Sequence, residues 1–259
     1  NGNNYTTPHT ITIQDPTPPI ITAPDDVIIE ATNLSTILTS NNYGTATASD
    51  IFGITIINNA TGTLSLGNNT IMWNVTDSNN NTATATQNIT LQDTTIPTIN
   101  ILGQSSLHQE YGVPYADAAP TSIDVVHGNL THSIITQNLV NYDTIGNYTV
   151  TYTVTDPSNN TATAIRNIMV TDTNTPTISL TGNTHQTIQY GSNYTDSGAI
   201  AFDVIDGNIS DRIVTQNPVD TRTVGNYTIT YTVTDKHRNQ AESISRNITV
   251  HDSVLPIIS

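Results

Sequence analysis

Hydrophobic and polar residues alternate strictly in several segments of this chain. Because successive side chains of a β-strand point to opposite faces, the aromatic and β-branched set of each segment is predicted to be buried, and the intervening set, mostly threonines, exposed. The strongest three segments have the inward residues Ile71, Trp73 and Val75; Tyr148, Val150, Tyr152 and Val154; and Tyr227, Ile229, Tyr231 and Val233.

A second alternating run follows each of these segments after a turn rich in Asp, Asn, Ser and Pro. Short strands separated by turns, with no helical periodicity, predict an all-β chain built of β-sandwiches with about seven strands each. The inward pairs of the second runs are Ile89 and Leu91, Ile168 and Val170, and Ile248 and Val250.

The alternating segments belong to a repeat. The sequence beginning at Gly67 recurs at Gly146 and Gly225, a spacing of 79 residues both times. A second marker, Asp-x-x-x-Pro, begins at Asp15, Asp93, Asp172 and Asp252. A period this constant indicates one folding unit copied in tandem. The predicted parts are the last strand of a preceding repeat (1–15), three sandwich domains (16–93, 94–172 and 173–252) and the first strand of a following repeat (253–259).

The two partial repeats predict a segment of a much longer protein. The alternative is a subunit whose terminal strands complete neighbouring subunits by strand addition at a sheet edge. Each unit is near the lower size limit for one stable core, and the absence of cysteine excludes disulfides as additional support.

The charge balance is strongly acidic, with 6 Lys and Arg against 21 Asp and Glu. This balance argues against nucleic acid as a partner. No Lys or Arg precedes Arg166, whereas 12 acidic residues do. There is no signal peptide and no apolar run long enough to span a membrane in this segment.

The final hairpin of each unit, Gly-Asn-Tyr-Thr-x-Thr-Tyr-x-Val-Thr-Asp in the second and third, resembles the immunoglobulin-like repeats of bacterial and archaeal surface proteins. The second and third units also share Tyr-Gly and Asp-x-x-x-Gly-Asn motifs, which are similar to a module of surface adhesins and crystal toxins. The opening of the first unit, from Pro18 to Asp26, resembles hyalin repeats. The resemblance implies tandem immunoglobulin-like sandwiches at the cell surface, used as spacers, stalks or surface-layer components.

Aspartates recur at the ends of the predicted units. If the members of one hairpin, such as Asp77 and Asp93, lie at the same pole, two carboxylates about 4 Å apart repel by roughly 4 kcal/mol at an effective dielectric near 20. Ca²⁺ would relieve this repulsion, since it prefers oxygen ligands on loops. The alternative is that each Asp caps its own turn and stays separately solvated. The candidate ligands are Asp15, Asp77, Asp93, Asp156, Asp172, Asp235 and Asp252.

A second acidic group lies inside the second and third units. It consists of Asp117 with Asp124, and of Asp196 with Asp203 and Asp206. The alternative interpretation is a tight Asp-Gly-Asn turn, and His127 replaces the third Asp in the second unit. His127 and His132 are interpreted as surface residues rather than metal ligands.

N-glycosylation is the other predicted modification. The acceptor pattern Asn-x-Ser/Thr occurs 14 times, several times at equivalent positions. Asn74, Asn88 and Asn247 are predicted to be accessible. The expected sites, in a host with a glycan-transferring system, are Asn68, Asn74, Asn80, Asn88, Asn129, Asn147, Asn159, Asn193, Asn208, Asn226 and Asn247.

These features predict a structural, non-enzymatic extracellular protein: a rod of sandwiches with short proline linkers in a surface layer, stalk or filament, contacting other copies or neighbouring repeats. The rival function is an adhesin or carbohydrate-binding array, which predicts exposed aromatic residues on loops; Tyr5, Tyr43 and Phe52 are the candidates. A third is the accessory stalk of a secreted enzyme. No nucleophile, phosphate-loop or metalloprotease motif is present.

Overall fold

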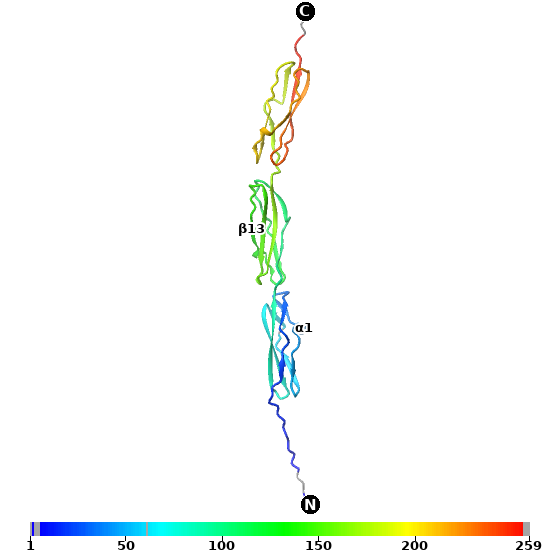
Figure 1. The fold of residues 1–259 in the computed structure, drawn as a ribbon, viewed down its shortest axis with the longest axis vertical. Helices are drawn as coiled ribbons and strands as arrows, with labels where there is room; N and C mark the ends of the chain where they lie inside the picture. Colours follow the sequence, from blue (N-terminus) through cyan, green and yellow to red (C-terminus); the bar gives the residue numbers. More distant parts are fainter. Residues whose placement is uncertain (1, 3–5, 61, 256–259) are drawn as a thin grey trace. The chain divides into compact units, whose positions relative to one another are not determined.

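The computed structural model describes residues 2, 6–60 and 62–255 of the chain. Strands form most of the regular structure (Figure 1). Within these residues the helical elements are one short helix, α1 (Ser40–Tyr43), and two 3-10 turns, η1 (Thr131–Ser133) and η2 (Ser210–Arg212). The alternation did not predict α1, whose single turn is closed locally by hydrogen bonds between Thr39 and Asn42. The predicted all-β class is confirmed.

The chain divides into two compact units, which do not follow the repeat boundaries. The first unit contains residues 1–105, 117–138 and 150–166, and the second contains residues 106–116, 139–149 and 167–259. The predicted domain boundaries therefore stay predictions. So does the assignment of 1–15 and 253–259 to neighbouring repeats: residues 6–15 form no strand here, and 256–259 lie outside the described residues, as does Tyr5.

The first unit holds a four-stranded sheet in the order β2-β8-β7-β5. β2 runs parallel to β8, and the other neighbours are antiparallel. Smaller sheets pair β1 with β4, β3 with β6, and β11 with β9 and β12. The strands are β1 (Ile20–Thr22), β2 (Val27–Glu30), β3 (Ser35–Ile37), β4 (Thr47–Ser49), β5 (Ile54–Asn58), β6 (Thr63–Ser65), β7 (Gly67–Asp77), β8 (Thr82–Gln92), β9 (Thr98–Asn100), β11 (Thr121–Asp124), β12 (Gly128–Asn129) and β13 (Ile135–Asn138).

The second unit repeats this plan, with a four-stranded sheet β17-β22-β21-β20 and a three-stranded sheet β16-β18-β19. β17 is again parallel to the last strand, β22. β10 pairs in parallel with β15 over residues 167–171, and β14 and β15 run through both units. The strands are β10 (Ser106–Glu110), β14 (Gly146–Thr155), β15 (Thr161–Thr171), β16 (Thr177–Leu180), β17 (His185–Gln189), β18 (Ala199–Asp203), β19 (Gly207–Asn208), β20 (Val214–Gln216), β21 (Gly225–Thr232) and β22 (Ile244–His251).

Burial follows the predicted alternation. Along β7 the side chains of Ile71, Trp73 and Val75 are buried, whereas Thr70 and Met72 between them are exposed. The corresponding inward residues of β14, β15, β21 and β22 are buried too. Each fully buried Val, Leu or Ile contributes roughly 1.5–3 kcal/mol of transfer free energy. The alternating sequence therefore forms the core because a slip of one residue would turn these inward side chains toward solvent.

A third four-stranded sheet has the order β10-β15-β14-β13. Each four-stranded sheet also buries one long polar side chain at an equivalent position: Gln87, Arg166 and Arg246. Gln87 donates to the backbone carbonyls of Asp25 and Tyr43, and its Oε1 lies 3.3 Å from the Trp73 indole Nε1, which donates to it. Arg246 donates to the carbonyls of Asn183, Thr181 and Gly198 and pairs with Asp196. These side chains satisfy loop carbonyls that burial would otherwise leave unpaired.

Candidate functional site

Three groups of acidic side chains converge, each built from the same three positions in the repeat. One is the linker Asp that begins an Asp-x-x-x-Pro marker, a second lies at the turn after β4, β11 or β18, and a third lies where β7, β14 or β21 meets the following hairpin turn. Within each group the candidate ligand atoms all lie within 4.8 Å of one another. The groups are the Asp15 cluster (Asp15, Asp50, Asp77), the Asp93 cluster (Asp93, Asp124, His127, Asp156) and the Asp172 cluster (Asp172, Asp203, Asp235).

Local turns orient these carboxylates. Asp124 Oδ1 accepts the backbone N–H of Val126 and of His127, both at 2.8 Å. Asp203 Oδ1 accepts those of Ile205 and Asp206 in the same way. This use of Asp to close its own turn is the alternative that the sequence left open. The turn occupies only one oxygen of each residue, so it fixes the direction in which the other oxygen points.

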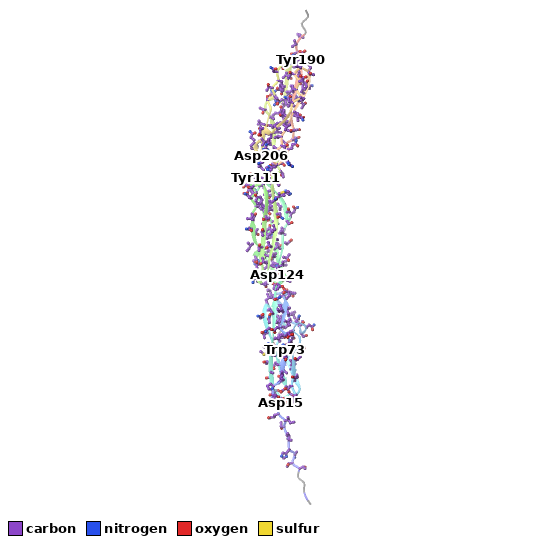
Figure 2. The ribbon with its side chains drawn as sticks, viewed as in Figure 1. Asp15, Trp73, Tyr111, Asp124, Tyr190 and Asp206 are labelled. Atoms are coloured by element: carbon purple, nitrogen blue, oxygen red, sulfur yellow. The ribbon has the colours of Figure 1, made fainter. Side chains whose placement is uncertain are left out.

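The second oxygens are enclosed without donors. Asp124 is 4 % exposed and Asp203 is 1 % exposed, and the Oδ2 atom of each is buried without a hydrogen-bond partner. Figure 2 labels Asp124 among the side chains of its segment. Burying a carboxylate oxygen without a hydrogen-bond donor costs free energy, which other interactions of the folded chain must offset.

The Asp77 and Asp93 carboxylates do not converge. Pairing of β7 with β8 joins Thr76 to Thr82 and Gly67 to Leu91, so Asp77 lies at the start of β8 and Asp93 follows its far end. The prediction from the sequence placed the two aspartates of one hairpin close together. The structure instead brings each linker Asp to the hairpin turn of the following repeat, as for Asp93 with Asp156.

His127 is not the surface residue that the sequence argument took it for. Its side chain is 8 % exposed, and Nδ1 lies 3.2 Å from Asp93 Oδ2 and 3.3 Å from Asp124 Oδ1. In the Asp172 cluster the nearest counterpart is His237, whose Nδ1 lies 3.2 Å from Asp172 Oδ2 and whose side chain is 28 % exposed. The two clusters therefore recruit a histidine from different turns.

The electrostatics of the two linker aspartates differ. Burial raises the pKa of Asp172, and the charges of Asp203 and Asp235 raise it further, so the pKa lies above its ordinary value. Burial also acts to raise the pKa of Asp93, but hydrogen bonds from Thr95 and Ser158 and the charge of His127 hold it below that value. The Asp172 cluster thus carries the less compensated negative charge.

The remaining predicted acidic ligands lie elsewhere. Asp117 accepts a hydrogen bond from the Tyr152 hydroxyl and lies 3.4 Å from Arg166, and Asp196 pairs with Arg246 and Tyr231. Asp206 pairs with Arg212 at 3.0 Å, and the exposed Asp252 contacts Gln189. Across the described residues none of these four joins a convergent group of three. The second predicted acidic group therefore divides between the clusters, the two buried arginines and the exposed Arg212.

The linker Asp is also held through its backbone. The side-chain amides of Asn81, Asn160 and Asn239 donate to the carbonyls of Asp15, Asp93 and Asp172 at 2.8, 3.1 and 3.2 Å. These asparagines come from the hairpin turn of the following repeat, where each also bonds the Asp that begins the turn. Sequence reasoning did not single them out, although they recur at the same spacing of 79 residues.

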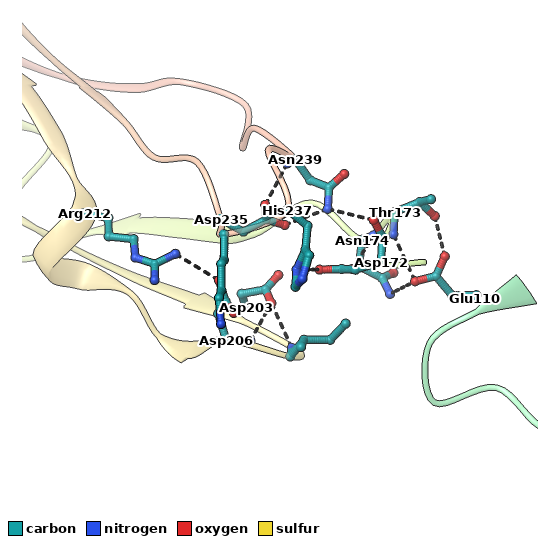
Figure 3. Close-up of polar contacts among 12 residues, drawn as sticks. Glu110, Asp172, Thr173, Asn174, Asp203, Asp206, Arg212, Asp235, His237 and Asn239 are labelled. Atoms are coloured by element: carbon teal, nitrogen blue, oxygen red, sulfur yellow. Dashed lines mark hydrogen bonds and ion pairs between the residues drawn. The ribbon is translucent and has the colours of Figure 1, made fainter. Parts of the chain in front are cut away.

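The residue after the linker Asp is held by the preceding repeat. Glu30, the last residue of β2, accepts the backbone N–H and the hydroxyl of Thr94 at 2.6 and 3.0 Å. Glu110, the last residue of β10, accepts the N–H and hydroxyl of Thr173 and the amide of Asn174. Figure 3 shows the Glu110 contacts beside the Asp172 cluster. The linker prolines Pro97 and Pro176 that follow are buried.

Apolar packing accompanies the polar contacts at the Asp93 cluster. Val126, in the turn between β11 and β12, is 5 % exposed and belongs to the same buried apolar cluster as Ala31 and Leu64. Phe52 is equivalent to Val126: it lies two residues after Asp50, as Val126 lies two residues after Asp124. Its backbone N–H donates to Asp50 Oδ1 in the same way. Phe52 is 38 % exposed.

The predicted glycosylation sites lie mostly on the surface. Nine of the eleven asparagines are exposed, whereas Asn74 and Asn247 are half-buried. The Asn74 Oδ1 atom is buried without a partner, so the accessibility predicted for this residue is not confirmed. Asn80 and Asn159 adopt positive φ values of 69° at their turns. Asn129 and Asn208 pair across the sheet with Ile123 and Phe202, which are 63 % and 58 % exposed.

Of the aromatic residues that the sequence placed outside the core, Phe52 is exposed as predicted. Tyr43 is not: it is half-buried and packs against Trp73, with the ring centroids 5.9 Å apart and the ring planes tilted by 58°. The sequence reading missed Tyr190 and Phe202, which are 47 % and 58 % exposed.

The sheets and the repeated clusters define the class of the protein, a tandem array of immunoglobulin-like β-sandwiches. The chain belongs to the family of bacterial surface proteins with an Ig-like domain, whose model matches residues 99–170 and 178–250. The two matches span more than half of the chain. Its setting is therefore the extracellular cell surface, and its role is structural or adhesive.

Two curated relatives are hyalins. Hyalin of Lytechinus variegatus is 29 % identical over 285 aligned residues, which cover 100 % of this chain and 52 % of that protein. Hyalin of Strongylocentrotus purpuratus is 27 % identical over 95 % of this chain and 22 % of its own length. The chain thus spans about half, or less, of these relatives. The alignments support the hyalin-like character predicted for residues 16–93.

Solved structures align weakly. A lipoprotein of Bacteroides thetaiotaomicron is 18 % identical over 31 % of this chain and 40 % of its own, with a TM-score of 0.28. The human desmocollin-1 ectodomain is 11 % identical over 91 % of this chain and 61 % of its own, with a TM-score of 0.32. These scores add nothing to the family assignment. Among the described residues, no helix has the length and apolar character needed to cross a membrane.

Proposed function

We propose that the chain is a structural segment of an extracellular surface array, a layer, stalk or filament in which immunoglobulin-like repeats act as spacers. The observation that carries this proposal is the contact set around each linker Asp. The preceding repeat binds the residue after it through Glu30 or Glu110, and the following repeat binds its carbonyl through Asn160 or Asn239. A linker bound from both sides transmits position from one repeat to the next.

X-ray scattering from the three-repeat chain tests this proposal. The unmodified chain is expected to give a scattering profile that one conformation fits. The double variant Asn160→Ala, Asn239→Ala is expected to need a mixture of conformations. The matched control is Asn79→Ala, which changes an exposed Asn in the first hairpin turn, outside the linkers at Asp93 and Asp172. Identical profiles for the double variant and the unmodified chain would contradict the proposal.

We also propose that the exposed sequons of the array carry N-linked glycans. Support comes from the exposure of Asn68, Asn88, Asn147 and Asn226 on or beside the sheets. Glycans there would discourage edge-to-edge pairing of strands that lack lysine. Glycopeptide mass spectrometry of the chain from its native host tests this, with Asn74 expected to be unmodified. Unmodified peptides throughout would contradict the proposal.

An adhesive, carbohydrate-binding array is the second candidate, and exposed apolar residues favour it. Ile200 and Phe202 line a hollow of about 190 Å³ together with Thr177, Ser179 and Ser210. An exposed aromatic ring beside hydroxyl groups is a surface on which a sugar ring can stack. Retention on immobilised polysaccharides, abolished by Phe202→Ser and kept by Phe52→Ser, would favour this function over a purely structural one.

A further inference from the structure

We infer that the Asp172 cluster binds one divalent cation of the calcium type through the carboxylates of Asp172, Asp203 and Asp235. The site joins the linker Asp to two turns of the repeat that follows it. It rests on the geometry of these residues alone, and holds whether the array is structural or adhesive.

The first argument is the donor set. All three candidate ligands are carboxylates, and their ligand oxygens lie within 4.8 Å of one another. Oxygens bound to one Ca²⁺ at about 2.3–2.6 Å lie at most about 5 Å apart, so the three can reach a single ion. Hard cations such as Ca²⁺ prefer oxygen ligands, and loops supply them readily.

The second argument is the enclosed oxygen of Asp203. This residue is 1 % exposed, Oδ1 is occupied by the N–H groups of Ile205 and Asp206, and Oδ2 is buried without a hydrogen-bond donor. Its carboxylate group points toward Asp172 and His237 (Figure 3). An anionic oxygen in this position lacks a partner that a cation would supply.

The third argument is the balance of charge. Asp172 and Asp235 are 6 % exposed each, so water screens the three carboxylates poorly. Within the described residues, these carboxylates form one ion pair, between Asp172 and His237. The nearby Arg212 forms its ion pair with Asp206 instead. His237 is 28 % exposed and can move into water when an ion enters.

The Asp93 cluster provides a contrast. There His127 is enclosed between Asp93 and Asp124, with an 8 % exposed side chain, and occupies the centre of the group. The equivalent turn position in the Asp172 cluster is Asp206, which faces Arg212 instead. His127 is thus enclosed among the ligands of the Asp93 cluster, whereas His237 contacts the Asp172 cluster from a partly exposed position, which makes the Asp172 cluster the stronger cation site of the two.

Calorimetric titration of the intact chain with Ca²⁺, after chelation and dialysis, tests the inference. Asp203→Asn keeps an oxygen for the turn N–H groups but removes the charge, and is expected to lower the number of bound ions by one. The matched control, Asp206→Asn, removes a neighbouring charge from outside the cluster and is expected to leave that number unchanged. The inference is overturned if Asp203→Asn binds like the unmodified chain, or if both variants lose the ion equally.

A second measurement needs no variant and so does not depend on how Asp203→Asn folds. Hydrogen exchange of the unmodified chain is compared with Ca²⁺ and with excess chelator. The turn amides of residues 205–206 and the linker amide of Asn174 are expected to exchange at least tenfold more slowly with Ca²⁺, because their acceptor carboxylates are then fixed by the ion. Unchanged exchange in both segments would overturn the inference.

Discussion

At the residue scale, buried loop carbonyls need hydrogen-bond donors, and different side chains supply them at three equivalent positions. Gln87, Arg166 and Arg246 occupy the same place in their sheets, and each donates to loop carbonyls. Each of the two arginines also forms an ion pair with an aspartate and lies over a tyrosine ring, so its charge is paired inside the fold. Arg246 lies 5.9 Å from the Tyr231 ring centroid, within cation–π range.

Loss of the Arg246 side chain is predicted to be costly. Arg246→Ala removes the ion-pair partner of Asp196 and one donor to each of three loop carbonyls, and breaking a buried ion pair on one side costs about 3–5 kcal/mol. Arg246→Gln, which copies the first repeat, is expected to cost less because Gln can still donate to the loop. Urea denaturation measures both variants. Equal losses for the two would show that the charge, rather than the hydrogen bonds to the loop, carries the stability.

Asp196 predicts a specific dependence of stability on pH. Burial raises its pKa, but hydrogen bonds from Tyr231 and Tyr194 and the charge of Arg246 outweigh this, so the folded pKa lies below the unfolded value of about 3.9. The unfolded state therefore binds the proton more readily, and the stabilisation present above about pH 4 is lost as the pH falls through the folded pKa. Asp196→Asn is expected to flatten the acid limb of the unfolding free energy. An unchanged acid limb would contradict this assignment.

At the scale of elements, the hairpin turns determine where the cluster aspartates lie. β7 and β14 end at a turn whose fourth residue, Asn80 or Asn159, has a φ of 69°, a conformation that Asn tolerates better than most residues. The following Asn then reaches both the turn Asp and the linker. Turn geometry thus couples the end of the hairpin to the connection between repeats.

Substitutions at Asn159 test the importance of this turn. Asn159→Gly is expected to be neutral or slightly stabilising because glycine accepts positive φ without a Cβ clash. Asn159→Val is expected to destabilise by about 1–2 kcal/mol, since a β-branched residue is strained there. Chemical denaturation gives both values. A Val variant as stable as the Gly variant would mean that the turn relaxes to another conformation.

The elements themselves were predictable from the sequence, and the clusters only in part. Period-two alternation defined β7, β14 and β21 because a slip of one residue would expose the inward apolar side chains of these strands. Convergence of carboxylates depends on which strand ends meet, which alternation does not report. Asp50 was missed because it lies 74 residues before Asp124, outside the 79-residue period. His127 was misplaced because its burial depends on the Asp93 linker, 34 residues before it in the chain.

At the scale of the whole molecule, the linkers between repeats are bound from both sides. Buried prolines, the Glu110 contacts and the Asn160 and Asn239 amides all act on segments of a few residues. Proline removes backbone freedom before folding, and the side-chain contacts remove most of what remains. This restriction of the linkers is the property that the proposed spacer function requires.

The most direct test measures the distance distribution across one linker. The chain has no cysteine, so Thr84→Cys and Thr163→Cys, both exposed and one repeat apart, place two spin labels uniquely. Pulsed electron–electron double resonance is expected to give one narrow distance distribution, and Asn160→Ala is expected to broaden it. A broad distribution in the chain with an intact linker, unchanged by Asn160→Ala, would contradict the account.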